Sequence, residues 1–288
     1  MIGSYIKTSR RNLMHNKLFS FINIVGLAIS MSVGLLLIAF VLDLRSYDRF
    51  HTNGERIYRI TSVLTANHEQ SGSRSGGKFA TTSLKTGKLI RQKVTGIDQY
   101  AGAEVTILHN DFSKDAKVGS TILPIKGFWA EPSFFRVFTF PMLEGNPETA
   151  LKDPYSIVLT ETAARKLFGN QSALGKAIRF DTLDYQVTGV MKDVPFFSHI
   201  SFEALVSLSS AEQLNRNNFE KWENMPSNYV YLLLPPTVDI GSIQSQLDVL
   251  AKEENRVEEN TKIHLELLPL YKIVVGESLR PSEGGLAP

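Results

Sequence analysis

The sequence contains no cysteine among its 288 residues. A disulfide framework, a thiolate metal site and a lipid-modified N-terminal cysteine are therefore excluded. A strong charge of either sign is also absent, because 31 Lys and Arg nearly balance 29 Asp and Glu to give a net charge of +2. This balance gives no indication of nucleic-acid binding. The lack of disulfides does not identify a redox compartment, since a chain of this size can bury a sufficient core without them.

Acidic residues are missing from the first 42 positions, and the 25 residues from Leu18 to Leu42 carry no charge of either sign. At about 1.5 Å of rise per residue, a helix over this run spans roughly 37 Å, enough to cross a hydrocarbon core of about 30 Å with some tilt. We therefore expect a transmembrane helix over 18–42. A buried helix of a soluble protein and a cleaved signal peptide are the alternatives, although residues 39–44 offer no small-residue cleavage pattern.

The charges that flank this run predict its orientation. Lys7, Arg10, Arg11 and Lys17 precede it, whereas acidic and basic residues are mixed after it. The positive-inside bias therefore places residues 1–17 in the cytoplasm and the chain from Asp43 onward outside. Residues 2–17 also have the pattern of a basic amphipathic helix lying in the membrane interface. The alternative is a basic flank that only sets the topology.

Three small residues within the apolar run fall on one helix face. Gly26, Ser30 and Gly34 are spaced at i, i+4 and i+8. Such a face lets another helix approach closely in lipid, so it predicts packing against other membrane helices. The alternative is that Gly and Ser are simply common in membrane helices.

A stretch of mixed aromatic and charged residues follows the apolar run. Tyr47 and Phe50 lie where an aromatic belt at the headgroups is expected. Asn53-Gly54 is a turn signal, and 57–64 alternates as a strand does.

This stretch and several others, before and after it, resemble the FtsX-like, MacB-like permeases of ABC transporters. The resemblance extends in order over nearly the whole chain, and the matching stretches are Arg10–Leu13, Phe21–Leu27, a YDxFHxxxxRIYR pattern at Tyr47–Arg59, Phe134–Pro141, Ser156–Glu161, Phe168–Gly169, Gly175–Lys176, Val187–Val190 and Phe196–Phe202. The signature residues that it singles out are Tyr47, Asp48, Phe50, His51, Arg56, Ile57, Tyr58, Arg59, Ser198 and His199.

The resemblance implies a division of the chain and a set of partners. It implies a cytoplasmic segment at 1–17, a transmembrane helix at 18–42 and a periplasmic core domain at 43–272. The polar tail at 273–288 then leads to a membrane region that the sequence lacks. The implied partners are a cytoplasmic ABC ATPase subunit, other permease helices in a dimer, the lipid bilayer and periplasmic or outer-membrane proteins. No cofactor is implied in this chain, because ATP is bound by the separate ATPase.

The pattern of the outer domain predicts a mixed α+β fold of two lobes, because helices and strands do not alternate strictly. Thr160 is a good N-cap for a helix that Gly169 ends. Helices are predicted at 82–94, 132–138, 160–169 and 240–254, and strands at 57–64, 99–108, 120–129, 155–160, 177–180, 185–191, 202–208, 229–234 and 262–268. The segment 65–78 is predicted to be a polar loop, and the aromatic-rich stretch 128–140 to be core or, as the alternative, a partner-binding patch.

Catalytic motifs are missing. There is no GxSxG elbow and no HExxH pattern, and the histidines have no metal-ligand spacing. Gly72–Lys78 fits GxxxxGK, but Phe79 stands where a hydroxyl should meet Mg²⁺, so nucleotide binding is not expected. His199 is expected to make a structural hydrogen bond. Asp181 with Asp184 is interpreted as a turn, and the acidic run at 253–259 as a solvated helix face.

These observations predict the N-terminal part of an ABC transporter permease subunit, in which the periplasmic domain transmits motion driven by ATP hydrolysis elsewhere. The expected location is the inner membrane. Family substrates include peptides, antibiotics and lipoproteins, and the sequence does not select among them. The alternatives are a single-pass, membrane-anchored periplasmic binding or scaffold protein and an anchored enzyme.

Overall fold

The computed structural model describes residues 11, 14–15, 17–65, 77–97, 102–214, 220–222, 224–225, 227–257 and 262–276. The segment 2–17 expected to be amphipathic lies almost entirely outside the described residues, as do most of the loop expected at 65–78 and most of the tail expected at 273–288. The chain forms two compact units, 1–46 and 47–288. The functional boundaries expected at 1–17, 18–42 and 43–272 stay predictions.

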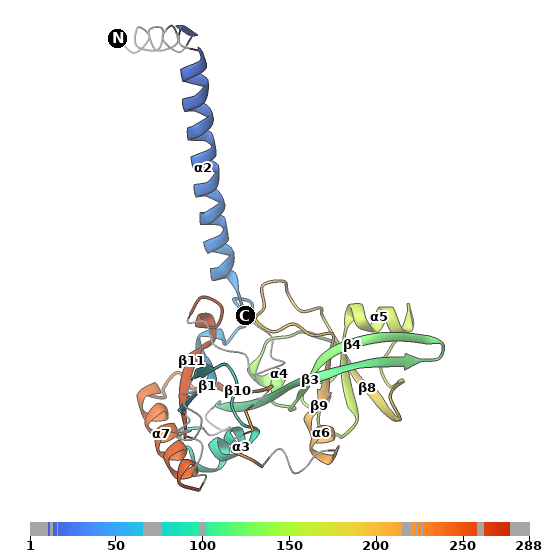
Figure 1. Ribbon diagram of the computed structural model, residues 1–288. Helices are drawn as coiled ribbons and strands as arrows, with labels where there is room; N and C mark the ends of the chain where they lie inside the picture. Colours follow the sequence, from blue (N-terminus) through green and yellow to red (C-terminus); the bar gives the residue numbers. More distant parts are fainter. Residues whose placement is uncertain are drawn as a thin grey trace, which may run out of the picture. The chain divides into compact units, whose positions relative to one another are not determined.

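In the first unit the structure describes one long, uninterrupted helix, α2 (Lys17–Ser46), which includes the whole charge-free run (Figure 1). The helix is long and apolar enough to cross a membrane, and none of its residues is buried. Ser30 and Ser32 donate hydrogen bonds from their hydroxyls to the carbonyls of Gly26 and Ala28, at 2.9 and 2.8 Å. These polar side chains are therefore satisfied within their own helix.

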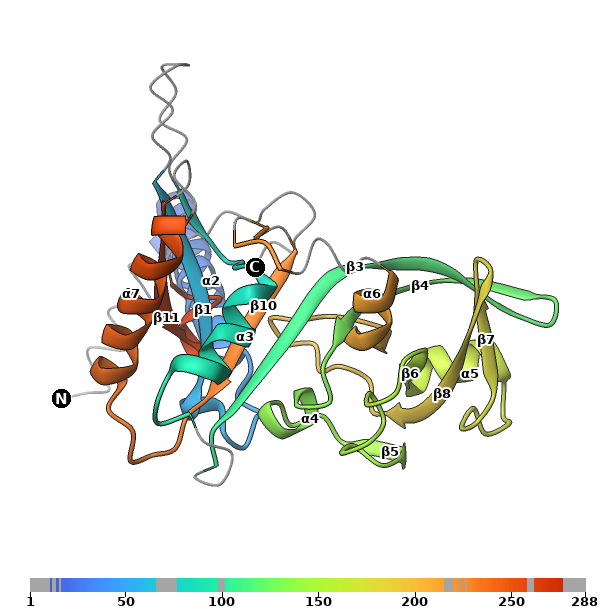
Figure 2. The same ribbon diagram turned by 90° about the horizontal axis from the view of Figure 1, so that it is seen from below.

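The second unit is built on one mixed sheet (Figure 2). Its strands are β1 (Ile57–Thr65), β2 (Gly77–Phe79), β3 (Glu104–Val118), β4 (Thr121–Ala130), β5 (Met142–Gly145), β6 (Ser156–Thr160), β7 (Ala177–Phe180), β8 (Leu183–Met191), β9 (Ala204–Ser207), β10 (Asn228–Leu233) and β11 (Lys262–Pro269). The order along the sheet is β11-β1-β10-β3-β4-β9-β6-β8-β5, with β2 beside β1 and β7 beside β3 and β8. The β4–β9 and β6–β8 pairs are parallel.

Two lobes share this sheet, which agrees with the mixed α+β fold of two lobes expected from the sequence. In Figure 2, β1, β10 and β11 lie at one end, β5, β6 and β8 at the other, and the long hairpin β3–β4 joins the ends. The helices are α3 (Leu84–Lys93), α4 (Phe134–Val137), α5 (Glu161–Phe168), α6 (Leu208–Leu214) and α7 (Ile240–Val257), with short 3₁₀ turns η1 (Gly54–Arg56) and η4 (Leu270–Lys272).

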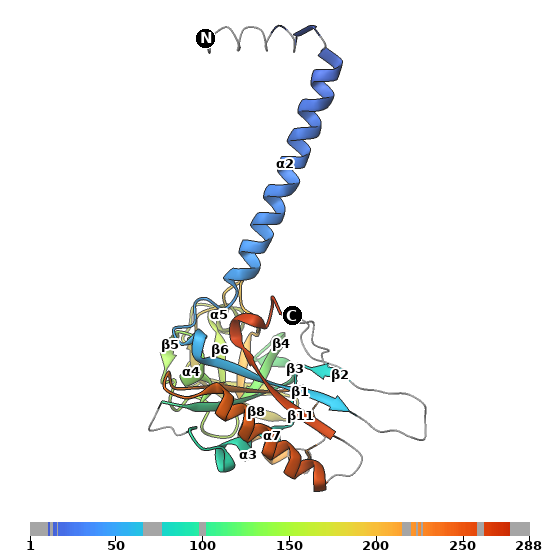
Figure 3. The same cartoon turned by 90° about the vertical axis from the view of Figure 1, so that its left-hand side faces the viewer.

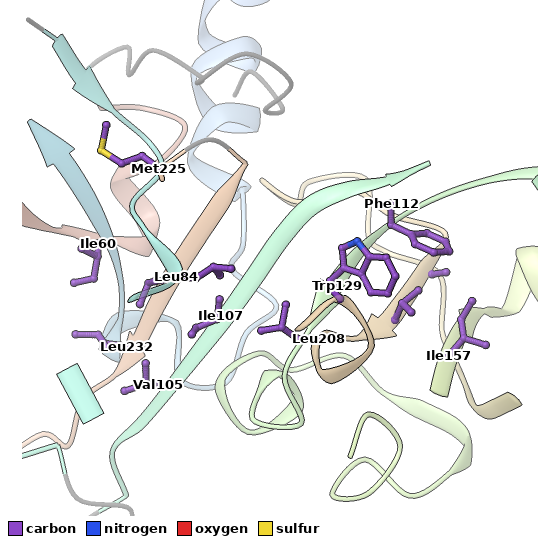
Figure 4. Packing of buried hydrophobic residues seen from close by; sticks show 14 of the residues in the cluster. Ile60, Leu84, Val105, Ile107, Phe112, Trp129, Ile157, Leu208, Met225 and Leu232 are labelled. Carbon is purple, nitrogen blue, oxygen red and sulfur yellow. The ribbon is translucent and has the colours of Figure 1, made fainter. Parts of the chain in front are cut away.

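Alternating side chains along the strands give the sheet a buried core on each face. In β10, Val230 and Leu232 belong to one cluster, and Tyr229, Tyr231 and Leu233 belong to the other. The first cluster, which we call the helix-side core, also contains buried residues of α3, α5, α6 and α7. Figure 4 shows part of this core, with Leu84 of α3 and Leu208 of α6. The second, which we call the aromatic-side core, contains α4 and most of the expected aromatic-rich stretch.

Local signals explain the ends of several helices. The Ser83 hydroxyl accepts a hydrogen bond from the Thr86 amide at 3.2 Å, and Thr160 caps α5 through the Ala163 amide at 3.3 Å. Gly169 ends α5 with φ of 64°, a conformation that favours glycine. In α7, Ile243, Leu247 and Leu250 are buried as the amphipathic pattern predicts, and Gln244 bonds to the backbone of β11 at Leu265 and Leu267. Figure 3 shows α7 beside β11.

Several details differ from the expectations, and neither β5 nor α6 was predicted. The end of the expected polar loop forms β2, because Lys78 lies opposite Val63 and pairs with Glu266 at 2.6 Å. The strand expected at 99–108 continues to Val118, because it forms a hairpin with β4. The strand expected at 202–208 ends at Ser207, where α6 begins. Glu254 is buried rather than solvated and pairs with Lys85 at 2.7 Å.

Candidate functional site

Buried charged and polar side chains gather on the aromatic side of the sheet, close to the start of the second unit. We call Asp48, His51, Arg59, His199 and Tyr231 the signature cluster. Four of them belong to the motifs that carry the family resemblance, and each of the five buries polar side-chain atoms inside the protein. Burying so many polar groups is costly unless they meet partners, so their contacts define the candidate site.

Asp48 is the centre of the cluster. It is 1% exposed and has φ of 60°, a left-handed conformation that Asp tolerates better than most residues. Its amide donates to the Phe197 carbonyl at 2.9 Å, and its Oδ1 accepts from the His199 amide at 3.1 Å. The Ser198 hydroxyl lies 3.5 Å from the same oxygen. These contacts, which we call the Asp48 clamp, join two segments separated by 150 residues.

His199 extends the clamp into the sheet. Its Nδ1 lies 2.8 Å from Asp48 Oδ1, outside hydrogen-bonding alignment, and its Nε2 is 2.9 Å from the hydroxyl of Tyr231 in β10. The expected structural hydrogen bond of His199 is therefore present. The path from Asp48 through His199 to Tyr231 leads from the first residues of the unit to a central strand.

His51 is held neutral beside this path. Its Nδ1 accepts a hydrogen bond from the Thr139 amide at 3.0 Å, which leaves Nε2 to carry the proton, 3.9 Å from Asp48 Oδ1. Phe50, Phe138 and Phe140 surround the ring with centroid distances of 4.1–5.3 Å. Burial, partly offset by Asp48, lowers the pKa of His51 to about 4. The imidazole is therefore uncharged near neutral pH.

Arg59 and Tyr231 face each other across neighbouring strands. They are register partners in the β1–β10 pair, and both are at least 94% buried, with exposures of 6% and 1%. Burial raises the pKa of Tyr231, and the nearby Arg59 guanidinium opposes part of that rise. The phenol therefore stays protonated and available to His199.

The other signature residues lie around the cluster rather than in it. Tyr47 packs edge-on against Phe197 at 5.5 Å, and Ile57 is fully buried in the aromatic-side core. Arg56 donates to the Leu234 carbonyl at 2.7 Å and fixes the end of β10. Tyr58 points to the opposite face, where it packs against the helix-side core. The functional role expected for the signature residues stays a prediction.

Sequence reasoning did not select Tyr231 or Thr139, although both complete the cluster. Tyr231 sits in the NYVYLL strand, where two tyrosines alternate with apolar residues on one face. That alternation was an available signal, because a buried phenol usually requires a polar partner. Thr139 acts through its backbone amide, for which no side-chain signal exists.

The Asp48–His199–Tyr231 arrangement resembles an acid–base relay but is closed to substrates. The side chains of Asp48 and His199 are 1% and 2% exposed, and Tyr231 is 1% exposed. A catalytic nucleophile or base must reach the proton or atom it acts on, and these groups reach only one another. Among the described residues, no group of three or more His, Asp or Glu side chains could hold a metal ion.

A second candidate is a cleft of about 790 Å³ between the end of α3 and α7. Its polar groups bond to each other: Thr95 donates from its amide and its hydroxyl to Gln246 at 2.8 and 3.0 Å, and Lys93 pairs with Glu253 at 3.0 Å. The charged side chains that line this cleft, Lys93 and Glu253, are therefore already paired with each other rather than presented to a ligand.

Gly26, Ser30 and Gly34 lie in α2, and their expected role as a packing face stays a prediction. A Cβ added at either glycine would meet no atom within 4 Å, and the Ser30 hydroxyl bonds to Gly26. No described part of the chain covers this face of α2.

Comparison with known proteins matches the chain to one family. A family model described as the MacB-like periplasmic core domain matches residues 20–250. No curated protein matches the chain. A domain described as part of a permease protein from Porphyromonas gingivalis is 22% identical, with a TM-score of 0.64, over 83% of this chain and 97% of that domain.

Two further solved structures have weaker likeness. The periplasmic region of MacB from Actinobacillus actinomycetemcomitans is 14% identical, with a TM-score of 0.49, over 74% of this chain and 89% of that one. The extracellular domain of the noncanonic ABC-type transporter YknZ from Gram-positive bacteria is 18% identical, with a TM-score of 0.48, over 72% and 99%. The Porphyromonas domain supports the fold of the second unit, and the family model assigns the family.

Proposed function

The chain belongs to the MacB-like periplasmic core domain family, and we propose that it is the N-terminal part of an ABC transporter permease subunit that couples ATP hydrolysis in the cytoplasm to movement of its periplasmic domain. The family is one of transporter permease domains and not of classical enzymes. The coupling, the inner membrane, the dimer and the ATPase partner are parts of the proposal.

The observation that carries the coupling is the Asp48 clamp. The chain leaves α2 at Ser46 and is fixed two residues later by hydrogen bonds to Phe197 and His199. His199 contacts Tyr231 in the centre of the sheet. Because Tyr47 alone separates the last residue of α2 from Asp48 along the chain, a displacement of the end of α2 is expected to reach the sheet.

The coupling is tested with the full chain reconstituted together with the ABC ATPase that co-purifies with it. Because the sequence has no cysteine, a single Leu174→Cys spin label reports the distance between two copies without background labelling. ATP binding is expected to shift that distance distribution. In Asp48→Asn the shift is expected to shrink or vanish while ATP hydrolysis continues, because the neutral amide weakens the clamp.

Asp181→Asn is the matched control, since Asp181 pairs with Lys114 at the exposed end of the sheet and touches nothing in the clamp. This control should behave as the wild type. An unchanged distance distribution in the wild type on ATP binding, or the failure of any ATPase to co-purify, would contradict the proposed function.

The proposed orientation places the N-terminus in the cytoplasm and the second unit in the periplasm, and it rests on the basic flank before the charge-free run. Reporter fusions after Lys17 and after Lys78 are expected to report cytoplasm and periplasm respectively. Reports from the same side of the membrane would reject a single crossing.

A further inference from the structure

Strand β3 passes from one lobe of the second unit to the other at a β-bulge (Figure 2). On one side of the bulge, His109 lies opposite both Asn228 of β10 and Trp129 of β4. The register with β4 then shifts before Phe112, so two residues of β3 lie opposite one residue of β4. Bulges change the direction of side chains and often lie beside functional positions, so the contacts of His109 at this junction matter.

Both ring nitrogens of His109 face oxygen atoms. Nδ1 lies 2.6 Å from Asn228 Oδ1, and Nε2 lies 3.0 Å from Asp111 Oδ2. The amide nitrogen of Asn228 donates to the Asn224 carbonyl at 2.9 Å, which fixes the oxygen of that side chain toward the ring. The other carboxylate oxygen of Asp111 accepts a hydrogen bond from the indole of Trp129. The two oxygens that face His109 are therefore both acceptors.

This arrangement suits the charged ring and neither neutral form. A neutral imidazole donates from one nitrogen and accepts at the other, so each neutral form would direct a lone pair at one of the two oxygens. The imidazolium donates from both nitrogens, and a hydrogen bond between two charged groups is roughly twice as strong as a neutral one. The contacts of His109 are therefore complete only when the ring carries both protons.

We propose that His109 is a proton-operated latch between the two lobes of the second unit. The charged ring joins Asn228, in the lobe that contains β10, to Asp111. Asp111 is held by Trp129, which packs against Tyr185 of β8 in the other lobe. When the ring loses a proton as the pH rises, one of its two bonds becomes a contact between two acceptors, and the junction loosens. The inference goes beyond the proposed function and does not depend on it, because it involves neither a membrane nor an ATPase.

The surroundings of the latch keep its carboxylate charged. From β3, Asp111 faces the ring, while Asn228 of β10 and Trp129 of β4 are neutral. The side chains of His109 and Asp111 are 16% and 59% exposed. Burial opposes the charge of Asp111, but the hydrogen bonds from His109 and Trp129 and the charge of Lys114 outweigh burial and lower the pKa of Asp111. The group that changes charge near neutral pH is therefore the imidazole.

A strained turn lies beside the latch. Ser227, the residue before Asn228, is 8% exposed and has φ of 62°, a left-handed conformation that is uncommon for serine. Its carbonyl accepts a hydrogen bond from the Asn110 amide of the bulge at 2.7 Å. Such strain persists only while the surrounding contacts maintain it. Loss of the neighbouring His109 bond is therefore expected to let this turn and the bulge shift together.

The test measures the distance between the lobes in the full chain, kept in detergent. Because the sequence has no cysteine, Leu174→Cys and Val249→Cys place one spin label on each lobe. Both positions are exposed, at 44% and 59%. An excess of unlabelled chain removes distances between copies. The distance distribution is expected to be narrow at pH 6 and to shift or broaden by pH 8.5.

Three further substitutions, made in the labelled chain, assign this change to the latch. His109→Gln does not titrate, so its distribution is expected to be the same at pH 6 and pH 8.5. In Asp111→Asn the side-chain oxygen can still accept from Trp129 while the amide donates to the neutral ring, so the narrow distribution is expected to persist at pH 8.5. Asp115→Asn, an exposed aspartate on the same strand, is the matched control and should respond to pH as the wild type does.

The outcomes decide the inference in either direction. A wild-type distribution that is the same at both pH values overturns it, and so does a pH response that survives in His109→Gln. If His109→Gln does not fold, Asp111→Asn still decides, because a variant that responds to pH as the wild type does would show that the contact between His109 and Asp111 is not the latch.

Discussion

At the scale of single residues, the neutral His51 makes the stability of the second unit depend on pH. Burial lowers its pKa from 6.5 to about 4. Between these two pH values the imidazole is therefore protonated in the unfolded chain and neutral in the folded chain. Stability supplied by the neutral ring is complete above pH 6.5 and is lost as the pH falls toward 4. The loss is about 1.4 kcal/mol per pH unit and about 3 kcal/mol in total.

The measurement compares chemical unfolding of the wild type and His51→Asn from pH 7.5 to 4. The Asn side chain can still accept the bond from the Thr139 amide but does not titrate. The variant is expected to be less stable at pH 7.5 and to lose less stability on acidification. Carboxylates titrate in both proteins and cancel in the difference. Parallel curves for the two proteins would show that His51 is not held neutral by the fold.

Four residues of the signature cluster could be selected from the sequence, but Tyr231 and the assembly of the cluster could not. The order of motifs marked Asp48 and the Ser198-His199 pair, yet nothing local indicates that residues 150 positions apart share one oxygen atom. The His199–Tyr231 bond depends on the register of β10, and a shift of one residue would place Tyr231 on the opposite face. The identity of the four residues that lie in the family motifs was therefore predictable, and the geometry was not.

At the scale of elements, the parallel pairing of β4 with β9 depends on one glycine. A Cβ added at Gly127 would lie 2.2 Å from the backbone carbonyl oxygen of Ala204, its register partner. Backbone cannot move aside as a flexible side chain can, so Gly127→Ala is expected to separate the strands and cost at least about 1–3 kcal/mol. The measurement is the free energy of unfolding.

Gly241→Ala, in the first turn of α7, is the matched control. The added Cβ would meet only Asp239 side-chain atoms at 3.5 Å, an ordinary contact. Alanine at a compatible helical position is expected to stabilise by about 0.4–1 kcal/mol. Equal effects of the two substitutions would show that the close approach of Gly127 to β9 is not maintained in solution.

The small-residue face of α2 is expected to pack against other membrane helices. No residue of this helix is buried within the chain, and Ser30 already has its hydrogen bond, so the attraction must come from close backbone packing. Replacing both Gly26 and Gly34 by Leu is expected to weaken crosslinking to co-expressed partner helices and to leave insertion intact. Undiminished crosslinking of the double variant would assign the face to lipid.

Most individual elements were predictable because their signals are local. Alternation marked β1, the Thr160 cap and Gly169 bounded α5, and the period of apolar residues identified α7. The errors arose where pairing decides the outcome. β2 exists because it joins the edge of β1, and β3 extends to Val118 because β4 lies beside it. Pairing between strands depends on how they meet in the fold, and the residue pattern of a single strand does not encode it.

At the scale of the whole molecule, the two lobes of the second unit are expected to unfold together. The helix-side core is continuous from Ile60 of β1 to Val187 of β8, and the hairpin β3–β4 belongs to both lobes. A shared core and shared strands couple the lobes, because neither can lose its packing without exposing apolar surface of the other. The unit, produced without α2, is therefore expected to fold alone and to melt in one cooperative transition.

The two tryptophans provide a probe for each lobe. Trp129 packs against Phe112 and Tyr185 on the side of β8, whereas buried Trp222 donates a hydrogen bond to Asn255 of α7 at 3.0 Å. In Trp222→Phe the emission comes from Trp129 and reports the lobe that contains β8. In Trp129→Phe it comes from Trp222 and reports the lobe that contains α7. For each variant, the unfolding midpoint measured by fluorescence is compared with the midpoint measured by circular dichroism of the same sample, which does not depend on the tryptophan. Coincident midpoints by both methods in both variants are expected. If the fluorescence of either variant changes before its circular dichroism, the lobes unfold separately, and the β3–β4 hairpin acts as a tether rather than as part of a common core.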